Sequence, residues 1–320
     1  MNTWIKRSAW LLGVLALAGS LVACGGRDLS NQVAALDLGP GLPAAQPPQG
    51  LAFSVLKTSE SNGAPEAFIV AGGSWLQYRH PVHTAVLVKH PQATFLFDTG
   101  LGRQVAQQFG ANTWLDRQFF AYGPVNPVAD QFEKAGWAID SVKMIVPSHM
   151  HWDHISALPD FPDTQVWASA TERDHARQGH APGFLQSQFA GVKQWQDLNF
   201  KPLAYLGFAA SLDLFGDGSV VLVPLAGHTA GQIGMFLNLP SGQRYFFTGD
   251  VTWTIEGLQW AADRSWLLRQ LVHVDHDEPG NQRAIGHIHQ IMQRFPELIV
   301  VPAHDENVFK RLPHFPQFKG

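Results

Sequence analysis

Residues 148–154, Ser-His-Met-His-Trp-Asp-His, place three histidines and one aspartate close together in the chain. Imidazole nitrogens and carboxylate oxygens are ligands that zinc and neighbouring transition metals accept. In an extended segment, side chains two residues apart point the same way, so His149 and His151 can converge on one ion. Asp153 and His154 then begin a turn and can face a second ion. The spacing predicts a metal site, and the alternatives are a run of polar loop residues or histidines that cap a helix.

Strands must position these side chains. The apolar segment 143–146 ends at Pro147 and predicts a buried strand directly before the motif. Three more apolar segments end near a possible ligand: 219–225 before His228, 244–247 before Asp250, and 298–301 before His304. Ligand sites gather at strand ends because the loops there can approach one another. We therefore expect these four strand ends to meet around one site.

The run from His149 to His154 matches the His-x-His-x-Asp-His signature of the metallo-β-lactamase-fold superfamily, which the chain resembles over about residues 51–310. This resemblance implies an α/β protein, a four-layer αβ/βα sandwich with two mixed sheets. It also implies two divalent metal ions, with zinc the expected metal. The first ion would be held by His149, His151 and His228. The second would be held by Asp153, His154 and His304, with Asp250 bridging the two ions.

The chemistry implied by this resemblance is hydrolysis. A hydroxide bridging two divalent ions would attack a carbonyl carbon, which one of the ions polarises. Asp153 is the candidate for orienting the nucleophile and moving a proton, and Asp250 completes the catalytic pair. A glutamate replaces the second histidine in oxygen-reducing diiron relatives, so His151 favours hydrolysis over redox chemistry.

Residues 86–100 resemble a hairpin of N-acyl-homoserine lactonases in this superfamily. In that role Asp98 would lie outside the ligand set and hold the metal-binding loops by hydrogen bonds, although it can equally be an Asx-turn residue. Trp152, Trp253 and Trp260 are candidates for a pocket that takes an apolar acyl tail, or else they are core residues.

A lactone is therefore the expected small-molecule substrate, with one departure from the pattern. The lactonases usually carry tyrosine three residues after the bridging aspartate, where this chain has Trp253. An indole donates a hydrogen bond but supplies no proton to a leaving alkoxide. The alternatives are a thioesterase, a β-lactamase-like amidase, or a non-catalytic tethered metal-binding protein.

The N-terminus predicts export. Lys6 and Arg7 precede the apolar stretch 9–23, which suits a signal peptide. It ends in Leu-Val-Ala-Cys-Gly, which resembles a bacterial lipobox with Cys24 as the lipidated residue; the alternative is an ordinary secretory signal with an incidental cysteine. We expect a signal peptide at 1–23, a flexible tether at 24–50 and a catalytic domain at 51–320. The protein would be a membrane-anchored lipoprotein, in the periplasm or at the cell surface.

Composition fits this picture. The 320 residues are 45% hydrophobic, which is ample for a packed core, and the net charge is -4. Lysine and arginine are scattered, which disfavours a nucleic-acid partner. Cys24 is the only cysteine, so a metal site in the domain must use histidine and carboxylates.

Other segments receive simpler interpretations. We expect further strands at 51–56, 67–71, 84–88, 94–97 and 163–167, and helices at 127–137, 170–177 and 283–294. His80, His83 and His90 are predicted to be surface or rim residues. His287 and His289 lie about 200° apart on the last helix and cannot share an ion. The run 273–278 favours a solvated loop near the pocket, the alternative being a metal-binding run. Residues 180–205 are undecided and could cover a substrate.

Overall fold

The computed structural model describes residues 29–31 and 33–320, and two mixed β-sheets form its centre. One sheet joins, in this order, β1 (Ala52–Glu60), β4 (Val82–His90), β5 (Ala93–Phe97), β6 (Val142–Val146), β7 (Gln165–Trp167) and β8 (Trp195–Gln196). The other joins β13 (Leu298–Val301), β12 (Arg244–Phe247), β11 (Ile233–Asn238), β10 (Val220–Pro224) and β9 (Leu212–Asp213). The pairs from β5 to β8 and the pair β12–β13 are parallel, and the others are antiparallel.

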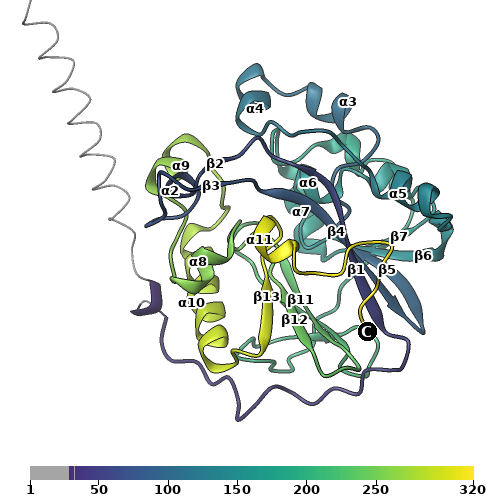
Figure 1. Cartoon of the computed structure of the whole chain (residues 1–320), viewed down its shortest axis with the longest axis vertical. Coiled ribbons are helices and arrows are strands. Elements are labelled where there is room, and N and C mark those ends of the chain that lie inside the picture. Colours follow the sequence, from purple (N-terminus) through teal and green to yellow (C-terminus); the bar gives the residue numbers. More distant parts are fainter. Residues whose placement is uncertain (1–28, 32) are drawn as a thin grey trace, which may run out of the picture.

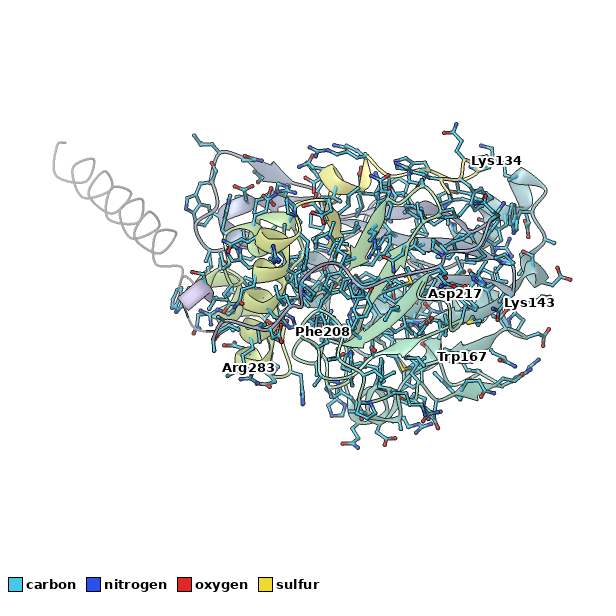
Figure 2. The ribbon with its side chains drawn as sticks, turned by 90° about the horizontal axis from the view of Figure 1, so that it is seen from below. Lys134, Lys143, Trp167, Phe208, Asp217 and Arg283 are labelled. Carbon is cyan, nitrogen blue, oxygen red and sulfur yellow. The ribbon has the colours of Figure 1, made fainter. Side chains whose placement is uncertain are left out.

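Helices cover the outer face of each sheet. Over the first sheet lie α5 (Val128–Ala135), α6 (Trp152–Ile155) and α7 (Ala170–Gln178), and over the second lie α8 (Ile255–Gln259) and α10 (Glu278–Arg294). Seen from below, α10 with Arg283 and the strand end with Trp167 lie on opposite sides of the molecule (Figure 2). The four-layer sandwich predicted from the sequence is therefore confirmed.

Shorter elements complete the fold. The short helices are α2 (Glu66–Ile69), α3 (Val105–Gly110), α4 (Trp114–Phe119), α9 (Trp266–Leu271) and α11 (Glu306–Phe309). The 3-10 turns are η1 (Leu29–Asn31), η2 (Ile139–Ser141), η3 (Leu158–Asp160) and η4 (Gln186–Gln188), and a separate ribbon pairs β2 (Ala64–Pro65) with β3 (Tyr78–Arg79).

Strand alternation builds three hydrophobic layers. In β4, Val86 and Val88 belong to the core between the two sheets, whereas Ala85 and Leu87 face the helices on the other side. The same alternation is expected wherever both faces of a sheet are covered. Figure 1 shows the two sheets side by side, with α5, α6 and α7 near one and α8 and α10 near the other.

Most predicted elements are present, and one is wrong. Residues 67–71 were expected to form a strand, but α2 (Glu66–Ile69) begins directly after Pro65, and only Val70 makes an isolated bridge, to Arg264. A run of five apolar residues cannot distinguish a strand from one buried helical turn. Ala67 and Ile69 are both buried in the helical arrangement.

The predicted tether also needs correction. Leu29 and Leu38 are buried in the cluster beneath α10, and Arg244 and Arg294 donate hydrogen bonds to the carbonyls of residues 43 and 40. Residues 33–50 therefore pack on the domain instead of extending from it. The predicted signal peptide and Cys24 lie outside the described residues. Among the residues that the structure describes, no helix is long and apolar enough to cross a membrane.

Candidate metal centre

The ends of β6, β10, β12 and β13 bring all seven predicted ligands together. In the first group, three imidazoles face one another. The inward ring nitrogen of His151 lies 3.1 Å from Nε2 of His149 and 2.8 Å from Nε2 of His228. These are the three residues predicted for the first ion, and their nearest donor atoms lie within 4.8 Å of one another.

The second group adjoins the first through Asp250. Its Oδ1 lies 3.2 Å from Nε2 of His154, and its Oδ2 lies 3.1 Å from Nε2 of His304 and 3.7 Å from Nε2 of His228. Asp153 completes this group, with Oδ2 3.4 Å from Nε2 of His304. Asp250 thus stands between the two groups.

The hydrogen bonds made by the outward ring nitrogens indicate that the inward nitrogens are free to bind cations. Nδ1 of His154 faces Oδ2 of Asp98 at 3.0 Å, Nδ1 of His228 faces Oδ1 of Asp275 at 2.9 Å, and Nδ1 of His304 faces the carbonyl of Val82 at 2.7 Å. Each acceptor fixes the proton on Nδ1, which leaves the lone pair of Nε2 pointing inward.

Inward lone pairs would repel the carboxylates unless a positive charge lies among them. Nε2 of His154 and Oδ1 of Asp250 are buried and lack a hydrogen-bond partner of acceptable geometry. Bonds of about 2.0–2.2 Å to a tetrahedral zinc ion put neighbouring donors about 3.4 Å apart. The observed separations are close to this value, so the residues present fit two divalent cations.

Electrostatics divide the imidazoles into two sets. Burial, together with the neighbouring rings, lowers the pKa values of His149 and His151 well below the usual range. Burial acts in the same direction on His154, but Asp250, Asp98 and Asp153 outweigh it and raise the pKa of His154. In Asp250, burial would raise the pKa, but the rings of His304 and His154 lower it well below its ordinary value.

Asp98 holds the loop that carries the motif. Its Oδ1 accepts a hydrogen bond from the backbone N–H of Ser148 at 2.6 Å, and its Oδ2 accepts the Ser148 hydroxyl at 2.9 Å and the ring of His154. Asp98 itself has φ +58°, a left-handed backbone conformation that is strained for residues other than glycine. These hydrogen bonds are of the kind expected for the first of the two roles that the sequence left open for Asp98, the other being an Asx turn.

Glu172, from α7, joins the first two ligand loops. Its Oε1 accepts the backbone N–H of Met150 at 2.7 Å, and its Oε2 accepts the hydroxyl of Thr229 at 2.7 Å and the N–H of Gly231 at 2.9 Å. Burial raises the pKa of Glu172, and these hydrogen bonds act against that shift. The carboxyl group therefore fixes His149 and His151 relative to His228.

Asp275 was missed by sequence reasoning. It lies in the run 273–278, which was expected to be a solvated loop, yet it is buried and bonded to His228. Arg264, also buried, donates to both oxygens of Asp275 and to the carbonyl oxygen of Asp250. No local pattern distinguishes Asp275 from its exposed acidic neighbours, because only the tertiary fold brings Arg264 and His228 to it.

Two of the three histidines predicted to be surface or rim residues are buried. His90 stacks on Phe215 and contacts Asp217, and His83 lies beside the second ligand group with Nδ1 3.3 Å from Oδ2 of Asp153. Burial lowers the pKa of His83. His80 is exposed, as expected. Both faces of strand β4 are covered by other parts of the fold, so a histidine in this strand becomes buried whichever way it points.

The three candidate pocket tryptophans have different environments. Trp152 is buried against Phe109, with ring centroids 4.2 Å apart, and is a core residue. Trp253 is half-buried and donates its indole N–H to Oδ2 of Asp250 at 3.0 Å. Trp260 follows α8 and is 44% exposed. Of the three, Trp253 is the one that contacts a predicted ligand.

Part of the undecided segment 180–205 packs against the motif. The carbonyl of Gly183 accepts the backbone N–H of Trp152 at 2.8 Å, and the ring of Phe184 lies 4.7 Å from that of His151. This gives the first ligand group an apolar flank beside its polar interior.

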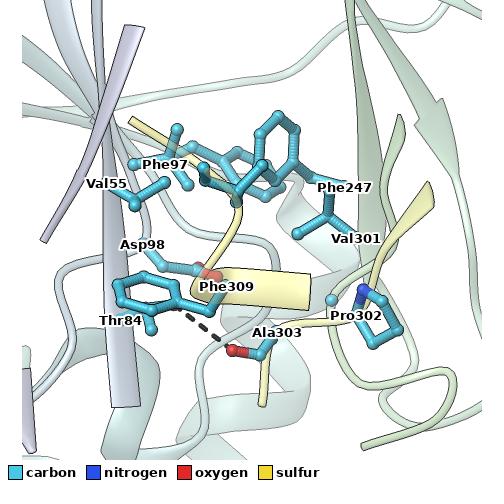
Figure 3. A pocket seen from close by; sticks show the side chains of 12 residues that line it. Val55, Thr84, Phe97, Asp98, Phe247, Val301, Pro302, Ala303 and Phe309 are labelled. Atoms are coloured by element: carbon cyan, nitrogen blue, oxygen red, sulfur yellow. Dashed lines mark hydrogen bonds between the residues drawn. The ribbon is translucent and has the colours of Figure 1, made fainter. Parts of the chain in front are cut away.

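A small pocket between the sheets is distinct from the ligand cluster. It is lined by apolar residues of both sheets, among them Val55, Phe97 and Phe247, and Asp98 also lines it (Figure 3). None of the seven predicted ligands lines it. We interpret it as a packing void beneath the site, not as a substrate pocket.

Known proteins resemble most of this chain. A family model described as the metallo-beta-lactamase superfamily matches residues 79–304. A probable metallo-hydrolase of Mycobacterium tuberculosis is 28% identical over 240 residues, covering 70% of this chain and 75% of that protein. The N-acyl homoserine lactonase AttM of Rhizobium radiobacter is 25% identical over 255 residues, covering 76% of this chain and 90% of the lactonase.

A solved structure has the same fold. It is an N-acyl homoserine lactone hydrolase with the product N-hexanoyl-L-homoserine bound at its catalytic metal centre. The TM-score is 0.63 at 14% identity, and the match covers 84% of this chain and 98% of the hydrolase. The match includes nearly the whole of that enzyme.

Proposed function

The chain belongs to the metallo-beta-lactamase superfamily and is a metallo-hydrolase, and we propose that it uses two divalent cations, zinc being the expected metal, to hydrolyse a lactone. One observation carries the dinuclear part of this proposal. Asp250 faces His304 and His228 with one oxygen and His154 with the other, so a single carboxylate joins two sets of inward-facing donors.

The cations would be held by the two groups described above. When bound, divalent cations act as Lewis acids toward a carbonyl group and lower the pKa of water toward neutrality. Asp153 lies at the edge of the second group and is half-buried. Its carboxylate can orient the attacking water, accept a proton from it and return that proton to the leaving oxygen. Burial would raise the pKa of Asp153, but His154, His83 and His304 lower it, so it remains ionised.

The lactone part of the proposal draws on the relatives. The match to AttM covers 90% of that lactonase, and residues 86–100 carry the hairpin resemblance seen in the sequence. Phe184 beside His151 supplies an apolar wall that suits an acyl chain. The substrate would be a small molecule with an apolar portion, such as an N-acyl homoserine lactone.

Trp253 favours a second candidate, a thioesterase. Its indole N–H is directed to Asp250 and provides no acidic proton for a leaving group. A leaving alkoxide would then depend on the single proton that Asp153 returns, whereas a thiolate, whose thiol has a pKa of about 8.5, departs without one. The thioester is therefore the substrate class that the tryptophan best accommodates, and a β-lactamase-like amidase is less favoured because an amine must be protonated to leave.

Substrate profiling separates these functions. The full chain, purified in detergent and loaded with zinc, should be assayed against N-acyl homoserine lactones, acyl thioesters and β-lactams, with metal content measured by elemental analysis. We expect two cations per chain and the highest kcat/KM with a lactone. Two cations without turnover of any substrate would instead indicate a metal-binding protein. Unchanged metal content and activity in both His149→Ala and Asp250→Ala would contradict the site itself.

The N-terminal sequence supports a further part of the proposal, export and lipid anchoring through Cys24. Several acyl chains, each methylene contributing about 0.8 kcal/mol, would hold the protein stably at a membrane. Cys24→Ser should move the protein from the membrane fraction to the soluble fraction of bacterial cells. Wild-type membrane attachment in this variant would rule out lipidation at Cys24, and a soluble, processed wild-type protein would indicate an ordinary secretory signal.

A further inference from the structure

We infer that His83 is an additional metal ligand, an imidazole donor to the same cation as Asp153 and His304. This inference rests on the proposed dinuclear site, and it adds a residue that the His-x-His-x-Asp-His pattern and its three distant partners do not contain. His83 lies far from the motif in sequence, at the start of β4.

The distances place His83 within the second group. Its Nδ1 lies 3.3 Å from Oδ2 of Asp153, and the same oxygen lies 3.4 Å from Nε2 of His304. Both values are close to the separation of about 3.4 Å between neighbouring donors that each lie about 2.0–2.2 Å from one zinc ion. Donor atoms of His83, Asp153 and His304 all lie within 4.8 Å of one another.

The backbone around His83 is tied to the other ligands. Val82 donates its N–H to the carbonyl of His304 at 3.1 Å and accepts the ring N–H of His304 at 2.7 Å. The carbonyl of His83 accepts the hydroxyl of Thr58 at 3.0 Å. Helix α6, which carries Asp153, packs on β4. Hydrogen bonds and packing therefore fix the backbone of His83 beside the other ligands, as a preformed metal site requires.

The nitrogen that faces Asp153 has no other partner. His83 is 7% exposed, and its Nδ1 makes no hydrogen bond of acceptable geometry. The ring lies between those of Trp152 and His304, with centroids 5.7 and 5.6 Å away. An unpaired buried nitrogen is costly. A cation shared with Asp153 and His304 would satisfy it.

The alternative role is an N–H donor to Asp153, and metal binding distinguishes the two. His83→Ala removes any interaction of the ring, whereas His83→Asn keeps an N–H donor near the position of Nδ1 but offers no imidazole nitrogen. The full chain and both variants should be purified in detergent. Stepwise zinc dissociation constants are measured by competition with a chromophoric chelator, and metal content by elemental analysis. His80→Asn, at an exposed histidine of the same segment, is the matched control.

If His83 is a ligand, both variants should bind one of the two zinc ions at least about 100-fold more weakly, and the control should bind like the wild type. Loss of an outer hydrogen-bond partner typically costs about 10–100-fold. Wild-type affinity in His83→Asn would overturn the inference, even if His83→Ala fails to fold. A wild-type chain that binds fewer than two ions would instead overturn the proposed dinuclear site itself.

Discussion

Among single residues, Asp275 connects His228 of the first ligand group with Asp250, which adjoins both groups. Its carboxylate accepts the ring N–H of His228 at 2.9 Å and is paired with Arg264, whose guanidinium also donates to the carbonyl of Asp250 at 2.6 Å. Arg264 lies over the ring of Trp253, 5.0 Å from its centroid. The buried carboxylate of Asp275 therefore positions His228 directly, and it positions Asp250 through Arg264.

We predict that Asp275→Asn weakens metal binding about 10–100-fold, because an amide is a poorer acceptor for the ring N–H of His228. It should also cost about 3 kcal/mol of folding free energy, because the charge of Arg264 stays buried without its partner. Chelator competition and chemical denaturation measure the two effects. Asp277→Asn, two residues away and exposed, should change neither quantity.

Trp253 provides a test of proton supply to the leaving group. Trp253→Tyr replaces an indole with a phenol, which can both donate a hydrogen bond and release a proton. We expect kcat for a lactone to rise about 100-fold, the low end of the roughly 10²–10⁴-fold that a general acid typically contributes, while kcat for a thioester stays unchanged. Steady-state kinetics of the wild type and of Trp253→Tyr on both substrates measure these changes in kcat. An equal change for the two substrates would mean that the residue acts on binding or on Asp250 instead.

At the level of elements, the site depends on loops that turn sharply after a strand. After β10, Gly227 has φ +153°, and a Cβ atom at this position would lie 2.5 Å from the backbone nitrogen of Asn281 in α10. Only glycine fits there, because the loop must pass directly over the start of the helix. This contact fixes the position of the loop that carries His228 relative to α10.

Gly227→Ala should therefore destabilise the protein by at least about 2 kcal/mol, from strain and a backbone clash, and should weaken metal binding as His228 moves. Thermal denaturation and metal titration are the measurements. Gly110→Ala, in α3 with no atom within 4 Å of the new Cβ, should have no such effect. Normal stability of Gly227→Ala would show that α10 can shift away from the loop.

For the whole molecule, the bound cations should contribute to stability. Asp98, Asp250 and Asp275 are buried at the site, with Asp153 half-buried beside them, and Arg264 is the one arginine that pairs with them among the described residues. Divalent cations would neutralise this excess of negative charge, and they bind the folded state because the unfolded chain has no assembled site.

We predict that removing metal with a chelator lowers Tm by at least roughly 5 °C, since a ligand at 100 times its Kd contributes about 2.7 kcal/mol. Differential scanning calorimetry of the full chain before and after chelation measures the shift, and adding zinc back should restore the original Tm. An unchanged Tm would indicate that cations bind too weakly to fill the site.

The sequence determined much of this protein because its informative patterns are local. Alternation and apolar runs predicted most of the strands, from β1 to β13, and the spacing of His149, His151, Asp153 and His154 indicated a ligand-bearing turn after β6. Apolar strands before His228, Asp250 and His304 identified the distant partners that the structure brings to the same end of the sandwich.

Tertiary structure alone decided the roles of His83, Asp275 and Arg264. Each lies in a stretch without a diagnostic spacing, and each acquires its role from elements that are remote in the chain: α6 for His83, and the loop after β10 for Asp275 and Arg264. Periodicity reports which face of an element is buried, but it carries no information about which charged group on another element will be opposite. That pairing is fixed only when strands, helices and loops that are remote in the chain pack together.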